Sequence, residues 1–316
     1  MVALVAGCGS GGGDPDELRL GYFLNMTHAV PVVGLEQGLY ADELPGVAIS
    51  EREFLAGPEA VTAMLAGSLD ASYLGSGPVI TAVSRAPGRL RIVAGANDAG
   101  AILVARAGSG IRTVADLDGR TVAFPGYGNT QDLALRRVLE EAGLAPTERG
   151  GTVRLAKIRN ADVATGLQRG QLDAAMLPEP WGTQLIANGD ATLLLDARQI
   201  LGGRYPTTVL VVTQELARER PAVVRALLRA NCRAVDLVWR NPELVVGVFQ
   251  EVIRGVQGRA PSRQTLRASE ARLRPTTSVD RAGTEELIGA ADRAGYLDGP
   301  VTYGMLVGGA LPAPCA

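Results

Sequence analysis

Short apolar runs alternate with helical patterns along the first two thirds of the chain. The runs are four to eight residues long and are bounded by glycine, proline or polar residues, as β-strands are. Because helical patterns lie between them, the sequence predicts an α/β protein with mainly parallel strands. The predicted strands are 18–23, 47–54, 71–74, 91–96, 101–106, 121–124, 153–157, 174–177 and 193–196.

The last third of the chain has a different pattern. From Gln214 onward the spacing is mostly helical, and Pro221 and Pro242 stand where the first turn of a helix tolerates proline. The sequence therefore predicts a helical C-terminal portion. One apolar face in this portion consists of Val223, Leu227, Leu228, Val235 and Val238.

One segment is repeated. Residues 62–74 (TAMLAGSLDASYL) and 165–177 (TGLQRGQLDAAML) share threonine, glycine, leucine and aspartate at matching positions. Each copy predicts a helix ended by glycine, then a turn and a buried strand. Common βα units could produce the same similarity by coincidence, but two similarly built lobes with a cleft between them explain it better. Ligands of open α/β sheets bind outside the carboxyl ends of the strands, so the cleft is expected there.

Composition excludes several classes of protein. The 316 residues contain one histidine and one lysine, Lys157, and carry a formal net charge of -2. A histidine-built metal site is therefore excluded, and the chain has no basic footprint for nucleic acid. The sequence contains no G-x-S-x-G, P-loop, C-x-x-C or H-E-x-x-H motif, so no catalytic set, metal or cofactor is predicted.

The N-terminus has three interpretations. Residues 4–8 (LVAGC) match the lipobox of a bacterial lipoprotein, in which Cys8 is lipidated and the following glycines form a flexible tether. Only seven residues precede Cys8, so residues 1–17 are interpreted as a signal remnant plus tether. A plain disordered terminus is the alternative. A G-x-G-x-x-G match at Gly7, Gly9 and Gly12 is weak, because no crossover helix fits before the first strand.

Two further cysteines remain, Cys232 and Cys315. In an exported protein they could form a disulfide that fastens the C-terminal tail. Because Cys232 lies in a predicted helix, a buried thiol is an equal alternative.

Polar and aromatic residues follow several predicted strands, or precede the apolar run 209–212. They are the candidate ligand-binding residues: Asn25, Thr27, His28, Ser76, Gly77, Gly128, Asn129, Thr130, Gln131, Glu179, Trp181 and Thr207.

Two predicted helix starts, near Asn129 or Thr130 and near Ser76, have free backbone N–H groups and the positive end of a helix dipole. Together they could hold an anion from both lobes. Ordinary helix capping, with Asp132 satisfying the dipole, is the structural alternative.

Three further side chains are candidate ligand contacts, and two of them, Trp181 and His28, also have a structural alternative. Trp181 could stack on a ligand or pack on its own lobe, and Glu179 could accept hydrogen bonds from an amine or ring N–H. His28 could contact the ligand or have a structural role at a helix end.

Five ordered segments resemble the nitrate/sulfonate/taurine-type solute-binding proteins of ABC importers. They are 21–29 (GYFLNMTHA), 56–60 (AGPEA), 67–71 (GSLDA), 128–136 (GNTQDLALR) and 178–181 (PEPW).

The resemblance implies a type II periplasmic-binding-protein fold, with two lobes joined by hinge strands. Lobe one would comprise 18–100 plus 210–316 and lobe two 101–209, with crossings near 97–103 and 205–210. It also implies an extracytoplasmic monomer, periplasmic or anchored by lipid to the cytoplasmic membrane, that delivers a small ligand to a permease and an ATPase.

The resemblance does not identify the ligand. Asn129, Thr130 and Ser76 could donate to a sulfonate or nitrate, whereas Glu179 suits a zwitterion or a ring with donors. The pair Asn25 and His28 is similar to relatives that bind thiamine-precursor pyrimidines. Some relatives are enzymes, but their cysteine-rich motif is missing here. A small-molecule enzyme that uses His28 or Glu179 is the alternative function.

Overall fold

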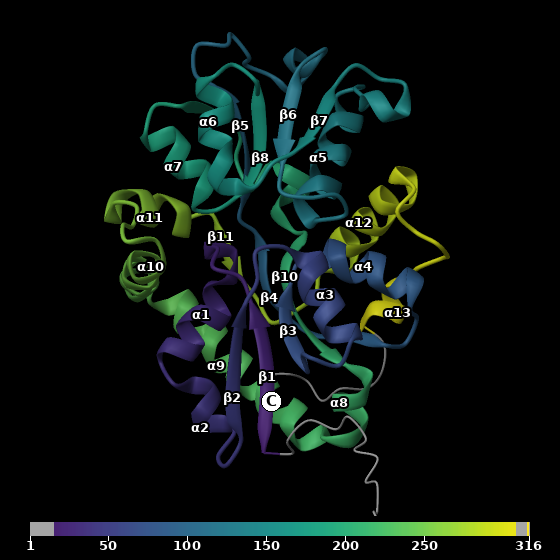
Figure 1. Cartoon of the computed structure of the whole chain (residues 1–316), viewed down its shortest axis with the longest axis vertical. Coiled ribbons are helices and arrows are strands. Elements are labelled where there is room, and N and C mark those ends of the chain that lie inside the picture. The colour runs from purple at the N-terminus through teal and green to yellow at the C-terminus, as the bar shows by residue number, and fades with distance from the viewer. Residues whose placement is uncertain (1–15, 308–314, 316) are drawn as a thin grey trace, which may run out of the picture.

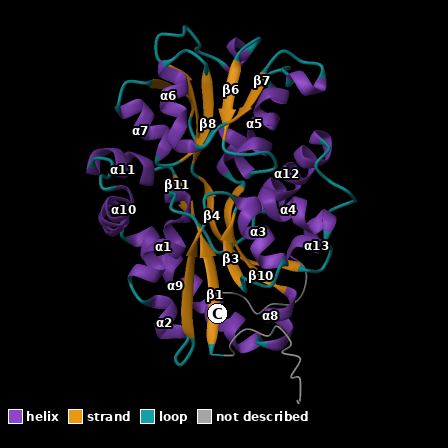
Figure 2. Ribbon diagram, in the orientation of Figure 1, coloured by secondary structure: helices purple, strands orange, loops and turns teal. Residues whose placement is uncertain are grey.

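Two β-sheets, each covered by helices, form two lobes stacked along the long axis of the molecule (Figures 1 and 2). The computed structural model describes residues 16–307 and residue 315. Cys8 and most of the predicted tether lie outside the described residues. No helix within 16–307 is both long and apolar enough to cross a bilayer.

The first lobe is built on a six-stranded sheet with the order β11-β4-β10-β3-β1-β2. Its strands are β1 (Glu17–Tyr22), β2 (Ala48–Glu53), β3 (Ala71–Leu74), β4 (Leu90–Ala99), β10 (Pro206–Thr213) and β11 (Leu273–Pro275). The helices of this lobe are α1 (Ala29–Glu36), α2 (Leu39–Glu43), α3 (Gly57–Leu65), α4 (Ser76–Arg85), α8 (Gln214–Glu219), α9 (Pro221–Arg240), α10 (Pro242–Gln257), α11 (Arg263–Glu270), α12 (Arg281–Ala294) and α13 (Tyr303–Val307).

The second lobe is built on a five-stranded sheet with the order β7-β6-β8-β5-β9. Its strands are β5 (Ala101–Arg106), β6 (Thr121–Phe124), β7 (Arg154–Lys157), β8 (Ala174–Pro178) and β9 (Ala191–Leu195). Helices α5 (Thr130–Glu141), α6 (Val163–Gln168) and α7 (Trp181–Ala187) cover this sheet.

The α/β class and the helical C-terminal portion are confirmed, whereas the expectation of mainly parallel strands holds for only part of each sheet. Strands β1, β2 and β3 are parallel, as are β6, β7 and β8. The remaining pairings are antiparallel, because β4, β5 and β10 lie at the crossings between the sheets and run against their neighbours. The apolar pattern does not predict β11, a three-residue edge strand within a helical region.

The internal repeat has a common structural role in the two lobes. Helices α3 and α6 end before Gly67 and Gly170, whose φ values of +73° and +68° favour glycine. The repeated aspartates then bind the start of the neighbouring parallel strand. The Asp70 carboxylate accepts from the Arg19 N–H at 2.8 Å, and the Asp173 carboxylate accepts from the Thr121 N–H at 2.9 Å. The repeat therefore positions β3 against β1 and β8 against β6.

The chain crosses between the two sheets twice. At the first crossing Gly100 alone separates β4 from β5, and Ala99 there has a φ of +55°. At the second crossing a 3-10 turn, Ile200–Gly203, connects β9 to β10. The Asn97 side chain links the two crossings, since its Nδ2 donates to the Thr207 hydroxyl at 3.0 Å.

Cys232 of α9 forms a disulfide with Cys315, with a Cα–Cα distance of 5.6 Å. Of the two alternatives for these cysteines, the structure therefore has the disulfide.

Candidate functional site

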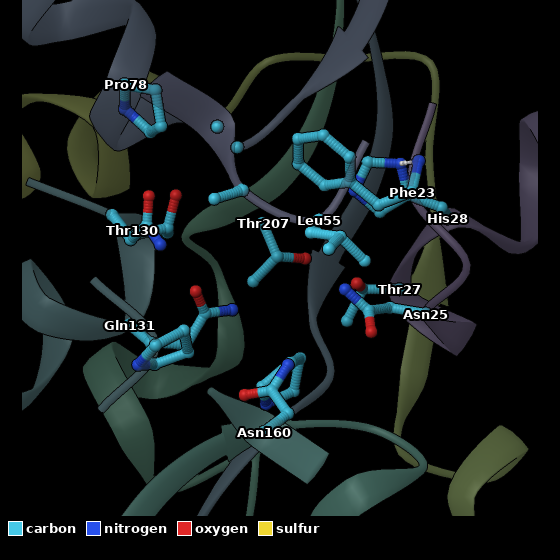
Figure 3. Close-up of a pocket in the computed structure, with 16 residues that line it drawn as sticks. Phe23, Asn25, Thr27, His28, Leu55, Pro78, Thr130, Gln131, Asn160 and Thr207 are labelled. Atoms are coloured by element: carbon cyan, nitrogen blue, oxygen red, sulfur yellow. Dashed lines mark hydrogen bonds between the residues drawn. The ribbon is translucent and has the colours of Figure 1, made fainter. Parts of the chain in front are cut away.

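A small cavity of about 40 Å³ lies between the two lobes. Figure 3 shows Thr130 and Gln131 on one side of it, opposite Phe23, His28, Asn25 and Thr27. The first lobe contributes Phe23, Asn25, Thr27, His28, Leu55, Ala56, Gly57, Gly75, Pro78 and Thr207, and the second contributes Pro125, Asn129, Thr130, Gln131, Asn160 and Pro178.

Most of these residues belong to segments at the carboxyl ends of strands β1, β2, β3, β6, β7 and β8. Thr207 is different, because it stands at the start of the antiparallel strand β10. The cavity thus occupies the position where open α/β sheets bind ligands.

The structure brings together many of the predicted site residues. Seven of them line the cavity: Asn25, Thr27, His28, Asn129, Thr130, Gln131 and Thr207. Five others lie beside it: Ser76, Gly77, Gly128, Glu179 and Trp181.

Several cavity residues are absent from the predicted set, although they also follow the ends of predicted strands. Leu55, Ala56 and Gly57 come after strand β2, and Asn160 comes after strand β7. Both strands were predicted from their apolar pattern, so inspection of the residues after every strand end would have identified this group. Pro125 and Pro178 also line the cavity, but they have no polar side chain that would mark them as candidates in the sequence.

Three helix N-termini meet at the cavity. The N-cap residues of α3, α4 and α5 are Ala56, Gly75 and Asn129, and no side chain caps any of the three helices. The first N–H groups of a helix have no partner within the helix, and they carry the positive end of its dipole. Because α5 belongs to the other lobe, helix ends from both lobes face the cavity. The Gly77 N–H of α4 already donates to Thr130 Oγ1, and Asp132 lies in the first turn of α5, as the capping alternative predicts.

No aspartate, glutamate, lysine or arginine is present among the described residues that line the cavity. Its polar groups are carboxamides, hydroxyls and one imidazole. The Oδ1 atoms of Asn129 and Asn160 are buried and have no hydrogen-bond partner. Asparagine is a favoured N-cap residue, yet the Asn129 side chain makes no capping hydrogen bond to α5. Its carboxamide is therefore available to the cavity.

His28 is held in one tautomer. Its Nδ1 accepts a hydrogen bond from the Phe23 N–H at 3.4 Å, so in the neutral ring the proton is on Nε2. Burial lowers the pKa of His28 to about 3, because the charged form would lose its hydration. The imidazole is therefore a neutral donor at the cavity wall.

Trp181 reaches the cavity indirectly. Its Nε1 donates to Asn25 Oδ1 at 2.9 Å, which leaves the Asn25 Nδ2 group available as a donor. The indole of the second lobe thus orients a carboxamide of the first.

Ser76 and Gly77 make other contacts across or near the junction. The Ser76 hydroxyl donates to the Pro206 carbonyl at 2.6 Å, and the Gly77 N–H donates to Thr130 Oγ1 at 3.1 Å. A Cβ on Gly77 would lie 2.6 Å from the Gly128 carbonyl oxygen, so the two backbones meet where only glycine fits. This contact explains why Gly77 and Gly128 flank the cavity without lining it.

Glu179 is fully buried and does not line the cavity. Its carboxylate accepts from the Thr183 and Ser269 hydroxyls at 2.7 and 3.0 Å. Burial raises the pKa of this carboxyl, while these donors oppose the shift. The protein's own donors therefore surround Glu179, which is separate from the cavity lining.

Known proteins are similar to this chain in sequence and in fold. The taurine-binding periplasmic protein of Escherichia coli K12 is 27% identical over 222 residues, which cover 69% of this chain and 66% of that protein.

Two solved structures have the same fold. The alkanesulfonate-binding protein SsuA of Xanthomonas axonopodis pv. citri, solved with MOPS, superposes with a TM-score of 0.75 at 23% identity, covering 90% of this chain and 94% of that one. The nitrate-binding protein NrtA of Synechocystis PCC 6803 superposes with a TM-score of 0.76 at 16% identity, covering 90% and 82%. The predicted periplasmic-binding-protein fold is confirmed.

The family model described as the NMT1-like family matches residues 11–245, which is most of the chain. This protein therefore belongs to the NMT1-like family.

Proposed function

We propose that this protein is the solute-binding receptor of an ABC importer and that it encloses a small oxyanion between its two lobes. One observation carries the proposal: three uncapped helix N-termini, from both lobes, converge on a cavity without charged side chains. The N-terminal ends of helices favour negative charge.

The donors suit a sulfonate or nitrate group. Asn25, His28, Thr130 and Gln131 supply N–H or O–H groups, and no fixed anion among the described lining residues opposes a second one. The names of the similar proteins, which refer to taurine, alkanesulfonate and nitrate, support the same class. Orphaned carboxamide oxygens of Asn129 and Asn160 would additionally accept from an ammonium group such as that of taurine.

Function would follow from closure of the lobes. In our proposal the lobes meet at the two crossings, near 97–103 and 205–210, and they close about them. The closed, ligand-bound monomer would then present its ligand to a permease driven by an ATPase. An extracytoplasmic location, with a lipid anchor at Cys8, would keep the receptor next to that permease.

A ligand panel tests the proposal. Thermal shift and calorimetry are measured with taurine, ethanesulfonate and nitrate, with methylammonium as a cation control and a pyrimidine as the ring alternative. We expect an anion or zwitterion to raise Tm in a concentration-dependent manner and to be recovered unchanged. Binding of the pyrimidine alone, binding of methylammonium alone, or chemical conversion of the ligand would overturn the proposal.

A further inference from the structure

Two clusters of buried side chains join the lobes outside the cavity. In the first, the Glu179 clasp, the fully buried Glu179 carboxylate of the second lobe accepts from Ser269 of α11 at 3.0 Å. Arg272, which follows α11, donates from Nη1 to Thr183 Oγ1 at 2.7 Å and from Nε to Asp196 Oδ2 at 2.8 Å. The first lobe therefore places a hydroxyl and a guanidinium on two carboxylates of the second lobe.

The second cluster, the Asp132 clasp, lies at helix α5. Asp132 is also fully buried, and its carboxylate accepts from the Gly128 N–H, Arg136 Nε and the Tyr296 hydroxyl, each at 2.8 Å. Tyr296 follows α12 of the first lobe, and its hydroxyl also accepts from Arg136 Nη2 at 2.8 Å. A single phenol thus connects the first lobe to a buried ion pair of the second.

The clasps lie on opposite flanks of the molecule. Figure 1 shows α11 below α7 on one side and α12 below α5 on the other, with the lobe crossings between them. Neither Ser269, Arg272 nor Tyr296 lines the cavity. The residues that the first lobe contributes to each clasp therefore lie outside the cavity lining.

The chemistry of the clasps links them to closure. A buried carboxylate needs hydrogen-bond donors, and bonds to an ionised acceptor are stronger than neutral ones. When the lobes separate, Glu179 loses Ser269 and Arg272, and Asp132 loses Tyr296. Water replaces these donors, so the free energy of closure depends on how well each clasp forms.

We propose that Ser269 and Tyr296 are positioning residues, which hold the lobes closed through the two carboxylates and thereby set how long the ligand is retained. This inference rests on the proposed receptor function, and it assigns Glu179 to closure instead of ligand contact. Closure stabilised by the protein itself would act on ligand dissociation, because the site for the first encounter is unchanged.

The test uses Ser269→Ala, Tyr296→Phe and the double variant in the full chain. Ligand kinetics are measured by stopped flow with the tightest binder among taurine, ethanesulfonate and nitrate. Each single variant is expected to dissociate about 5- to 20-fold faster, with association within about twofold, and the double variant to approach the product. Small-angle scattering of the ligand-free double variant should give a larger radius of gyration than the wild type.

Two control variants lose the same atoms within one lobe. Ser84 donates to the Thr81 carbonyl at 2.8 Å, and Tyr303 donates to the Val279 carbonyl at 3.0 Å. Ser84→Ala and Tyr303→Phe should leave dissociation and scattering unchanged, although they remove comparable hydrogen bonds.

Three results would overturn the inference: dissociation rates that match the wild type, controls that change as much as the clasp variants, or a slower association that accounts for the lost affinity. Scattering of the ligand-free variants needs no ligand, so it tests the clasps even if no oxyanion binds. An unchanged radius of gyration with normal ligand binding would reject the clasps and leave the receptor function intact.

Discussion

The cavity and the two clasps occupy the same interface between the lobes, yet they contain opposite kinds of polar group. The cavity is lined by neutral side chains and uncapped helix ends, whereas each clasp contains a fully buried carboxylate with its own donors. Burial raises the pKa of both carboxyls, Glu179 and Asp132, and the surrounding donors counteract it.

This difference indicates a division of roles. The Glu179 and Asp132 carboxylates connect the two lobes, because protein donors already occupy them and no acceptor position is left for a ligand. Groups with unused hydrogen-bonding capacity, such as the Asn129 carboxamide, stand where a ligand can complete them. Substitutions in the cavity, at its rim and at the contact between the lobes test whether the two kinds of polar group have these separate roles.

The largest effect is expected where the lobes touch at their backbones. In Gly77→Ala the new methyl would lie 2.6 Å from the Gly128 carbonyl oxygen and 2.8 Å from the Thr130 nitrogen. Neither backbone atom can yield easily, so the lobes cannot close fully. We expect calorimetry to show ligand affinity at least about 100-fold weaker, while the helix itself tolerates alanine.

The matched control is Gly247→Ala in α10, where a Cβ would have no neighbour within 4 Å. It should bind like the wild type. Wild-type affinity in Gly77→Ala would mean that ligand binding does not need the closed arrangement.

The second prediction introduces a charge into the neutral cavity. Asn129→Asp places a carboxylate at the N-terminus of α5, next to the proposed anion, and repulsion at about 4 Å in a partly buried site amounts to a few kcal/mol. Affinity for ethanesulfonate should fall about 30- to 100-fold, against about 10-fold for Asn129→Ala. Asn188→Asp, at the exposed C-cap of α7, is the control. Equal losses in Asn129→Asp and Asn129→Ala would contradict an anionic ligand.

The third prediction concerns the neutral histidine. The pKa of His28 is about 3 in the folded protein and about 6.5 when unfolded, so the unfolded state binds the extra proton between these values. Its contribution to stability is fully present above pH 6.5 and is lost as pH falls, by about 2 kcal/mol at pH 5. His28→Gln should remove this slope in urea unfolding measured at pH 5 and 8.

Asp98 of β4 provides a comparison of opposite sign. Burial, together with the negative charge of Asp280, raises the pKa of Asp98 to about 7. Its contribution is therefore fully present below about pH 4, the unfolded value, and is lost as pH rises through 7. Asp98→Asn should gain stability relative to the wild type at pH 8 and lose that advantage at pH 4. If His28→Gln and Asp98→Asn changed the pH dependence of the unfolding free energy in the same direction, the burial of His28 or of Asp98 would be contradicted.

The smallest effect is expected at the exposed rim. Leu55 lines the cavity yet is 81% exposed, so it can cover only the outer part of a ligand. Leu55→Ala should weaken ethanesulfonate binding by at most about threefold and leave nitrate unchanged, since only the alkyl group offers apolar surface. Val256→Ala, another exposed apolar residue on α10, is the control. A large loss for nitrate would place Leu55 deeper in the site than its exposure indicates.

Sequence patterns predicted much of the fold, since they depend on local periodicity and on the repeat. The predicted strand 71–74 coincides with β3, and the predicted helix start at Asn129 is the N-cap of α5. Strand direction was predicted less well. The antiparallel pairing of β10 depends on partners more than a hundred residues away in the chain, and the apolar run 209–212 does not reveal them.

The candidate site divides in the same way. Residues such as Asn25 and Gln131 were found because strand ends of one sheet gather at one edge, a rule that needs no coordinates. Glu179 and Trp181 also stand at a strand end, and the sequence could not show that their side chains bind other protein groups and do not line the cavity. Glu179 turns to Ser269 and Arg272, which are ninety or more residues later in the chain.

By itself, the sequence determined an α/β chain of two related lobes with a cleft of polar and aromatic residues at the strand ends, because periodicity, glycine positions and residue chemistry are local properties. Only the tertiary structure decided which polar residues face that cleft and which fasten its flanks. The reason is that a buried carboxylate is satisfied by whichever donors the fold brings to it, and in this protein two of those donors, Ser269 and Tyr296, come from the C-terminal part of the opposite lobe.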